Sequence, residues 1–274
     1  MPEPGRAYYL REEAIPRALI IVAVLSALLL SCSGPRSVGR FPAAEVEPAA
    51  AVDSVLARES RVGSIMGKIS VEAITPGREV DFSADFFFSP PDSFRANIRG
   101  LLGTTPGALV ALDDSTVAYF PGRDTVYVAV SDTSAENPVL GLNFSLPDLV
   151  CALAGYSGIS GADSGLAASV SGEGIYEVNF FAEGQINRLE ILPQAWIPRS
   201  RQIYSPQGDA VLDIDYSDFV ERGDRVRPSI IIVTNPLRGE KVTIEIEKEY
   251  FGRELPEDVF RLPLPETTVI WRLI

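Results

Sequence analysis

The amino-acid sequence predicts a mainly β protein, with about eleven or twelve strands in one curved antiparallel sheet and a few helices over its apolar face. From residue 62 onward, apolar and polar side chains alternate with a period of two, which is typical of strands that bury one face and expose the other. Turn residues separate these runs, and only two segments show helical spacing. The 274 residues, 46% of them hydrophobic, suffice for the core of one globular domain or two small ones.

The alternating runs form two groups with a helical segment between them. In the first group, Val80, Phe82 and Phe86 alternate with Asp81 and Asp85. Short turns join successive runs, so neighbouring strands should pair antiparallel. The predicted strands cover residues 65–73, 80–88, 94–98, 108–112, 116–120, 125–130, 175–181, 187–192, 200–204, 210–216, 229–233 and 241–250.

Two segments predict helices. Residues 46–60 place Val52, Val55 and Leu56 at helical spacing, and Pro48 suits a first turn. Residues 146–154 are a short apolar segment that Gly155 would end as a C-terminal cap. A curved sheet with helices over a cavity and a closed sandwich without one both satisfy this pattern.

The N-terminus predicts a lipoprotein signal. Three arginines precede an apolar run over residues 18–30, which is too short for the roughly 20 residues that a spanning helix needs. The run ends in Leu29-Leu30-Ser31-Cys32, which resembles the bacterial lipobox, and that resemblance implies cleavage before Cys32 and its acylation. A plain secretory signal or an uncleaved anchor is the alternative. The predicted parts are a signal peptide over 1–31, the lipidated cysteine with a flexible tether over 32–50, and a β domain over 51–274.

Charge and composition exclude several classes of function. The chain has 37 acidic and 24 basic residues, a net charge of -13 and no basic run, so it should repel nucleic acids and anionic lipid headgroups. It contains no histidine, and Ser-His-Asp or Cys-His catalysis therefore cannot be built. We expect no enzymatic activity, no cofactor and no nucleic-acid partner.

The remaining chemical candidates are carboxylates and a thiol. Asp213 and Asp215 share one face of a predicted strand, as do Glu245 and Glu247, and paired carboxylates can act on glycosides. A solvated strand face produces the same spacing and is the simpler interpretation. Cys151 lies in the apolar predicted helix, which favours an inert core thiol. No residues have the spacing of metal ligands, so no metal site is predicted.

Aromatic side chains are the candidates for a lipid cavity. The same alternation would also pack a closed core, so periodicity does not decide between the two. Each buried methylene contributes about 0.8 kcal/mol, so the roughly thirty methylenes of two acyl chains need a large apolar hollow to cross water. The predicted cavity residues are Phe82, Phe86, Phe88, Tyr119, Phe180 and Trp196.

The loop over residues 99–107, RGLLGTTPG, carries two leucines among turn residues. Leu101 and Leu102 are flanked by Gly100 and Gly103, where the chain can bend sharply. The leucines either fold back onto the end of the sheet or project as an apolar finger able to enter a membrane.

The order of these features resembles the LolB outer-membrane lipoprotein receptor family and related bacterial lipoproteins of the LolA/LolB superfamily. The likeness spans roughly residues 50–250 and rests on the lipobox, the first helix, the RGLLG loop, Pro147-Asp148-Leu149, and the runs GQINRLEI (184–191) and YSPQGDAVLDIDY (204–216). It implies an unclosed antiparallel half-barrel, with helices as a lid over a hydrophobic cavity for lipoprotein acyl chains. It also implies that a leucine at the position of Leu102 protrudes to hand the lipoprotein to the membrane. The extension over 252–274, with its VFRLPLP segment, resembles instead the soluble carrier LolA.

The predicted function is that of a protein anchored by lipid in the outer membrane and facing the periplasm. It would take lipoprotein acyl chains, with a periplasmic LolA-like carrier as a partner, and assist their insertion in the outer membrane. The alternative is a structural or assembly lipoprotein of the same fold that docks a protein partner. The apolar C-terminal residues Val269, Ile270, Trp271, Leu273 and Ile274 favour that alternative.

The lipobox predicts that Cys32→Ala abolishes palmitate labelling and stops cleavage at that site, because the thiol is the predicted acyl acceptor. Metabolic labelling with palmitate and the intact mass of the chain measure both effects. Cys151→Ala is the control and should leave labelling unchanged. Labelling that persists in Cys32→Ala would contradict the lipoprotein assignment.

Overall fold

The computed structural model describes residues 36–39, 41–43, 45–100, 106–112, 115–123, 125–130, 144, 146–256, 258–262, 264 and 268–273. The chain divides into two units, Met1–Arg36 and Ser37–Ile274, and the fold below is that of the second unit. Three predicted site residues, Cys32, Leu101 and Leu102, lie outside the described residues. None of the described helices is both long and apolar enough to cross a membrane.

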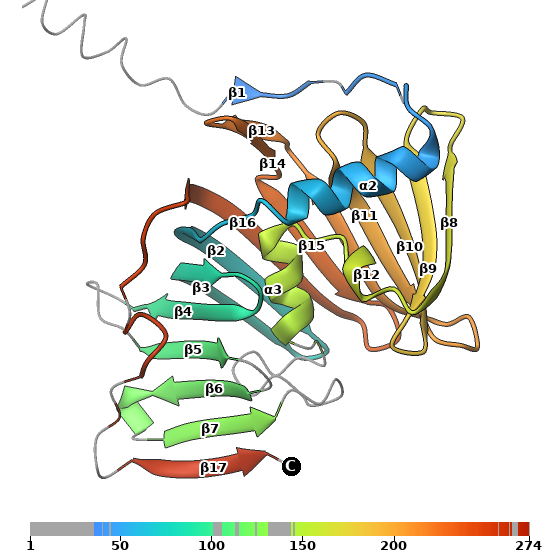
Figure 1. The fold of residues 1–274 in the computed structure, drawn as a ribbon. Helices are drawn as coiled ribbons and strands as arrows, with labels where there is room; N and C mark the ends of the chain where they lie inside the picture. Colours follow the sequence, from blue (N-terminus) through green and yellow to red (C-terminus); the bar gives the residue numbers. More distant parts are fainter. Residues whose placement is uncertain are drawn as a thin grey trace, which may run out of the picture. The chain divides into compact units, whose positions relative to one another are not determined.

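The second unit is built on one sheet of fourteen strands that does not close on itself (Figure 1). The strand order is β17-β7-β6-β5-β4-β3-β2-β16-β15-β12-β11-β10-β9-β8. The strands are β2 (Ile65–Thr75), β3 (Arg78–Ser89), β4 (Ser93–Arg99), β5 (Gly107–Leu112), β6 (Ser115–Phe120), β7 (Thr125–Val130), β8 (Ser164–Val170), β9 (Tyr176–Ala182), β10 (Gln185–Leu192), β11 (Ile197–Tyr204), β12 (Ala210–Ser217), β15 (Ile230–Asn235), β16 (Glu240–Phe251) and β17 (Val269–Leu273). The predicted unclosed, mainly β half-barrel is confirmed.

Two features of the sheet differ from the prediction. The sheet is mixed, because β17 pairs parallel with β7 while the other neighbours pair antiparallel. It also has more strands than predicted, since β8 and β17 extend its two edges. Strand β8 has the sequence SGLAASV and is almost entirely exposed, so it carries no alternation of buried and solvated positions. An edge strand of small, exposed residues therefore cannot be predicted from the alternation of buried and solvated side chains.

Smaller elements complete the unit. β13 (Val220–Arg222) and β14 (Arg225–Arg227) form a short hairpin. β1 (Arg36–Ser37) has two residues, and the 3₁₀ turns are η2 (Pro121–Arg123) and η3 (Ile159–Gly161).

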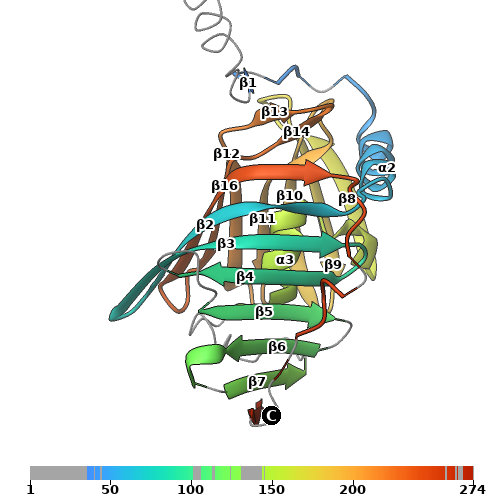
Figure 2. The same cartoon turned by 90° about the vertical axis from the view of Figure 1, so that its left-hand side faces the viewer.

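The two predicted helices are confirmed. α2 (Pro48–Glu59) begins with a proline, and α3 (Leu146–Ala154) has the predicted bounds. Gly155 follows α3 with a φ of 75°, the left-handed conformation that glycine adopts without a steric penalty. Figure 1 shows α3 inside the curve of the sheet, and Figure 2 shows the strands from β16 to β7 stacked in front of it.

Two apolar clusters form the core. The larger one joins the concave face of β2–β6, β12, β15 and β16 to α3, and includes Phe86 and Phe88. The smaller one joins β9 and β10 to α2, and includes Tyr176 and Phe180. Each helix therefore covers its own section of the sheet.

A buried arginine holds the last turn of α3. Arg227 of β14, whose exposed fraction is 2%, donates from Nη1 to the Ala154 carbonyl oxygen at 2.8 Å and from Nη2 to the Leu153 carbonyl oxygen. These carbonyls have no partner within the helix and carry its negative dipole end. The Glu249 carboxylate on β16 compensates the charge, with Oε1 3.0 Å from Arg227 Nη2. Arg227 thus couples the end of α3 to the sheet.

Removing the charge of Glu249 should destabilise this unit strongly. In Glu249→Gln, Arg227 stays buried without its anion, and breaking such a pair costs about 3 kcal/mol or more of unfolding free energy. Glu247→Gln is the matched control on the same strand, because Glu247 pairs with Lys68 at 2.6 Å where both side chains are one-third exposed. That change should cost about 1 kcal/mol or less. Urea unfolding measures both values, and equal losses in the two variants would refute the role assigned to Glu249.

Candidate functional site

An apolar hollow lies between the concave face of the sheet and α3. α3 turns Leu146, Leu149, Val150 and Leu153 toward it, which are spaced i, i+3, i+4 and i+7 and so lie on one face of the helix. Strands β2, β3, β4, β5 and β16 supply the opposite wall with apolar side chains only, among them Ala96. Apolar linings favour hydrocarbon over polar ligands, because they supply no hydrogen-bond partner.

The hollow is small in this structure. Its volume is about 60 Å³. A cavity of roughly 150 Å³ admits one benzene molecule, and a water molecule occupies roughly 30 Å³ of liquid. The side chains of α3 therefore occupy space that a longer hydrocarbon chain would need, and a movement of α3 away from the sheet would enlarge the hollow.

Three of the six predicted cavity residues lie on this side of the sheet. Phe82 lines the hollow. Phe86 and Phe88 are 1% and 2% exposed and belong to the same apolar cluster. The Phe88 ring meets the Tyr156 ring edge-on at 5.9 Å between centroids. The structure therefore brings together the three phenylalanines of β3.

The other three predicted residues do not lie around the hollow, so the prediction of one cavity lined by all six needs correction. Tyr119 follows Ala118 in β6, and Ala118 belongs to the concave cluster, so Tyr119 points to the opposite face of the sheet. Phe180 lies in the core beneath α2. Trp196 lies in the turn between β10 and β11, 5.7 Å from the Tyr176 ring between centroids. Alternation in sequence does not reveal which face becomes concave, nor that the molecule has two cores.

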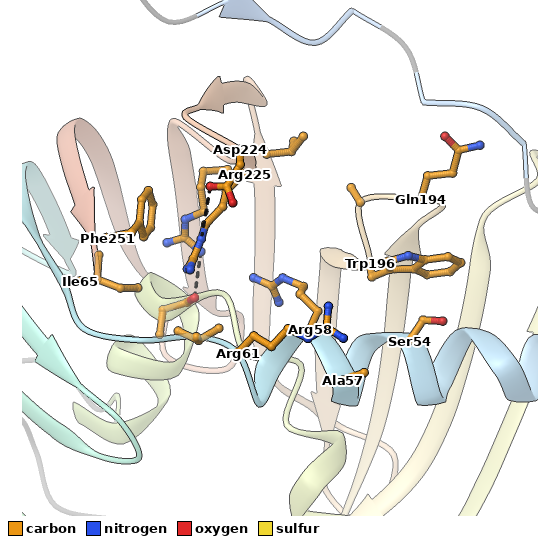
Figure 3. Close-up of a pocket in the computed structure, with 15 residues that line it drawn as sticks. Ser54, Ala57, Arg58, Arg61, Ile65, Gln194, Trp196, Asp224, Arg225 and Phe251 are labelled. Atoms are coloured by element: carbon orange, nitrogen blue, oxygen red, sulfur yellow. Dashed lines mark hydrogen bonds and ion pairs between the residues drawn. The ribbon is translucent and has the colours of Figure 1, made fainter. Parts of the chain in front are cut away.

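A second cavity, the arginine cleft, lies beyond the last turn of α3. It is lined by Arg58 and Arg61 at the end of α2 and by Arg225 and Arg227 of β14 (Figure 3). Its volume is about 520 Å³. Aromatic side chains, including Trp196 and Phe251, form part of its walls. This site was missed in the sequence, where the two arginine pairs are more than 160 positions apart.

The local spacing of the arginines is the signal that was available. Arg58 and Arg61 are three apart at the end of a helix, and Arg225 and Arg227 are two apart on a strand. The strand spacing places Arg225 and Arg227 on one face of β14, whereas Arg58 lies in the last turn of α2 and Arg61 lies in the turn after that helix. No local pattern indicates that the two arginine pairs meet in the fold.

Burial and like charge set the electrostatics of the arginine cleft. The pKa of Arg58 is lowered to about 10, first by burial and then by the neighbouring charge of Arg227. Arg58 Nη1 donates to the Gly155 carbonyl oxygen at 2.8 Å. Arg225 lies over the Phe251 ring, with the guanidinium carbon 4.8 Å from the ring centroid. The cleft therefore concentrates positive charge in partly desolvated surroundings.

The cysteine and the carboxylates considered above show no sign of a catalytic or metal-binding role in the described part of the chain. Burial raises the pKa of the Cys151 thiol to about 11, which disfavours the reactive thiolate. Burial, and then the charge of Asp215, raises the pKa of Asp213. Glu72, Glu79 and Asp81 bring carboxylate oxygens within 4.8 Å of one another. Two of these three residues are exposed, as is common on acidic surfaces that hold no ion, so we assign no metal site to them.

No protein-family model matches the sequence. No curated protein matches it either. Solved structures do match. A domain named as an outer membrane lipoprotein-sorting protein from Vibrio parahaemolyticus aligns with a TM-score of 0.63 at 13% identity, over 78% of this chain and 96% of that one.

Two further structures show the same likeness. A DUF1329 family protein from Desulfovibrio piger aligns with a TM-score of 0.62 at 11% identity, over 78% of this chain and 98% of its own. A LolA superfamily protein from Nitrosomonas europaea aligns with a TM-score of 0.53 at 14% identity, again over 78% and 98%. At such identities the likeness concerns the fold alone. The chain therefore has a fold of the LolA/LolB type.

Proposed function

We propose that this protein binds acyl chains of lipoproteins noncovalently between its sheet and α3. In this proposal it is a lipid-anchored, periplasm-facing protein of the outer membrane, which uses no cofactor and catalyses no reaction. The observation that carries the proposal is the purely apolar hollow, closed by the apolar face of a nine-residue helix. Hydrocarbon is the ligand class that such a surface selects.

The contacts that hold α3 are consistent with a tilting movement of this helix. Apolar packing against the sheet is non-directional, whereas Arg227 and Arg58 hold the last turn of α3 by hydrogen bonds. A helix fixed by directional bonds at one end can tilt about that end while its apolar face leaves the sheet.

The energies of closing and binding are of similar size. Fully burying one leucine or valine side chain contributes roughly 1.5–3 kcal/mol, so uncovering four such side chains of α3 costs roughly 6–12 kcal/mol. About eight to fifteen methylenes at 0.8 kcal/mol each offset that cost. An acyl chain can therefore replace α3 with little net change in free energy, which suits a protein that must also release its cargo.

Filling the hollow should weaken acyl-chain binding. Ala96→Phe places a ring in the hollow, and displacing about two methylenes should weaken the binding of a fluorescent fatty acid about tenfold. Ala182→Phe is the matched control, since Ala96 and Ala182 are both 7% exposed and Ala182 lies in the core beneath α2. Overpacking costs each variant about 1–3 kcal/mol of stability, so thermal unfolding is recorded in parallel. Equal binding by the two variants would rule out the hollow as the site.

Insertion into the membrane is assigned to the loop between β4 and β5, which contains Leu101 and Leu102. A protruding leucine can enter the acyl boundary without help from basic residues. Leu102→Glu should therefore reduce the insertion of a lipidated cargo into vesicles while the thermal midpoint shifts no more than for a surface substitution. Leu237→Glu, at a turn residue that is 64% exposed, is the control. Early unfolding of Leu102→Glu, or normal insertion by it, would remove the loop from the mechanism.

Docking of a protein partner is a second candidate function, favoured by β17. Val269, Ile270 and Trp271 are 53%, 59% and 59% exposed on the last strand of the described sheet. Consecutive strand residues point to opposite faces, so both faces of β17 present apolar side chains to solvent. Such an edge can accept a partner strand or cover an apolar partner surface.

A photo-crosslinker at position 271 should give a discrete adduct in cells if β17 docks a partner. The same crosslinker at the exposed Leu237 is the control and should give none. Absence of an adduct at position 271 would count against the docking function and leave acyl-chain binding untouched.

A further inference from the structure

The arginine cleft holds an excess of positive charge in a strongly acidic chain. Arg227 has a buried carboxylate partner, Glu249. The nearest acid to Arg225 is Asp224, at 3.9 Å, and the Asp224 side chain is 95% exposed. Within the described part of the chain, Arg58 and Arg61 make no ion pair. Four guanidinium groups thus line a cavity of about 520 Å³, in which Asp224 is the acidic lining residue, and the buried Glu249 pairs with Arg227.

Such an arrangement is unfavourable without an anion. Like charges in partly desolvated surroundings disfavour each other. The pKa of Arg58 is lowered first by burial and second by the charge of Arg227, while the charge of Glu59 raises it. An anion in the cleft reverses the sign of the interaction, because each guanidinium then gains a charged acceptor. The repulsion among the guanidinium groups therefore favours the binding of an anion.

We propose that the arginine cleft binds the phosphate group of a phosphate ester. The guanidinium groups line the cleft from two elements, α2 with the turn after it and β14 (Figure 3). A tetrahedral anion accepts hydrogen bonds from several directions and therefore suits donors from two sides. Guanidinium forks match phosphate oxygens in pairs. Arg61 and Arg225 are the contact residues, since Arg227 and Arg58 already hydrogen-bond the chain at the end of α3.

The walls of the cleft indicate that the ligand is larger than phosphate. Trp196 and Phe251 lie on two sides of the cleft, and Val62 and Ile65 add apolar surface. The cavity is much larger than one phosphate group, so the ester has room for an organic part that packs on these side chains. This phosphate site is separate from the proposed acyl-chain hollow, because uncharged hydrocarbon forms no charged hydrogen bond with the four arginines.

Two sources carry this chemistry: the headgroup of an anionic phospholipid and a soluble phosphate ester. The full chain in nonionic detergent is titrated with inorganic phosphate, with glycerol 3-phosphate and with phosphatidylglycerol in the micelles. Calorimetry measures the soluble ligands, and the fluorescence of Trp196 measures all three in a Trp271→Phe background. Diacylglycerol is the phosphate-free control lipid. Saturable binding of glycerol 3-phosphate identifies a soluble ester, and binding of phosphatidylglycerol alone identifies a headgroup.

Matched double variants separate the cleft from general charge. Arg61→Gln with Arg225→Gln should weaken binding of the phosphate ligand about tenfold or more. Arg78→Gln with Arg238→Gln removes the same charge from two exposed residues, one at the start of β3 and one in the turn between β15 and β16, and should leave the affinity within about twofold. Circular dichroism checks the fold, and Arg61→Gln alone serves if the cleft double variant does not fold. The proposal is overturned if none of the three phosphate ligands binds saturably, or if both double variants lose affinity equally.

Discussion

The hydrogen bonds from Arg227 to the last carbonyls of α3 are the interaction on which the rest of this structure depends. They place a charged side chain in an environment where its exposed fraction is 2%, which is tolerated because Glu249 and two carbonyl oxygens share the charge. Arg227 also lines the arginine cleft. Arg227 therefore lies at the boundary between the end of α3, which covers the apolar hollow, and the arginine cleft.

The residue after α3 shows how closely this junction is packed. Gly155 has a φ of 75°, and a Cβ there would collide with Arg227 Nη1 and lie 3.2 Å from Arg58 Nη2. Its carbonyl accepts the hydrogen bond from Arg58. The left-handed turn that ends the helix favours glycine, and a larger residue would have to displace the Arg227 guanidinium group from its hydrogen bond to Ala154. α2, α3 and β14 therefore meet at a closely packed point.

Local patterns in the sequence predicted the elements and left their assembly undetermined. Alternation placed Phe82, Phe86 and Phe88 on one face of β3, and helical spacing with Gly155 gave α3 its bounds, because each depends on neighbours a few positions away. Tyr119, Phe180 and Trp196 were assigned to the same cavity because the sequence pattern of a buried side chain is the same on either face of the sheet and in either apolar cluster. The arginine cleft depends on pairs of residues more than 160 positions apart, and no local pattern reports such a contact.

Net charge and local charge act over different distances, which reconciles an acidic chain with a cationic site. The charge of -13 describes the field at long range, and salt screens exposed charges beyond roughly 8 Å at physiological ionic strength. That field opposes an extended polyanion such as nucleic acid, which must approach the whole surface. A single phosphate inside the cleft interacts mainly with the guanidinium groups in contact with it. Composition therefore excludes partners by their size and charge density, while the side chains that line a cavity decide which small anion it can hold.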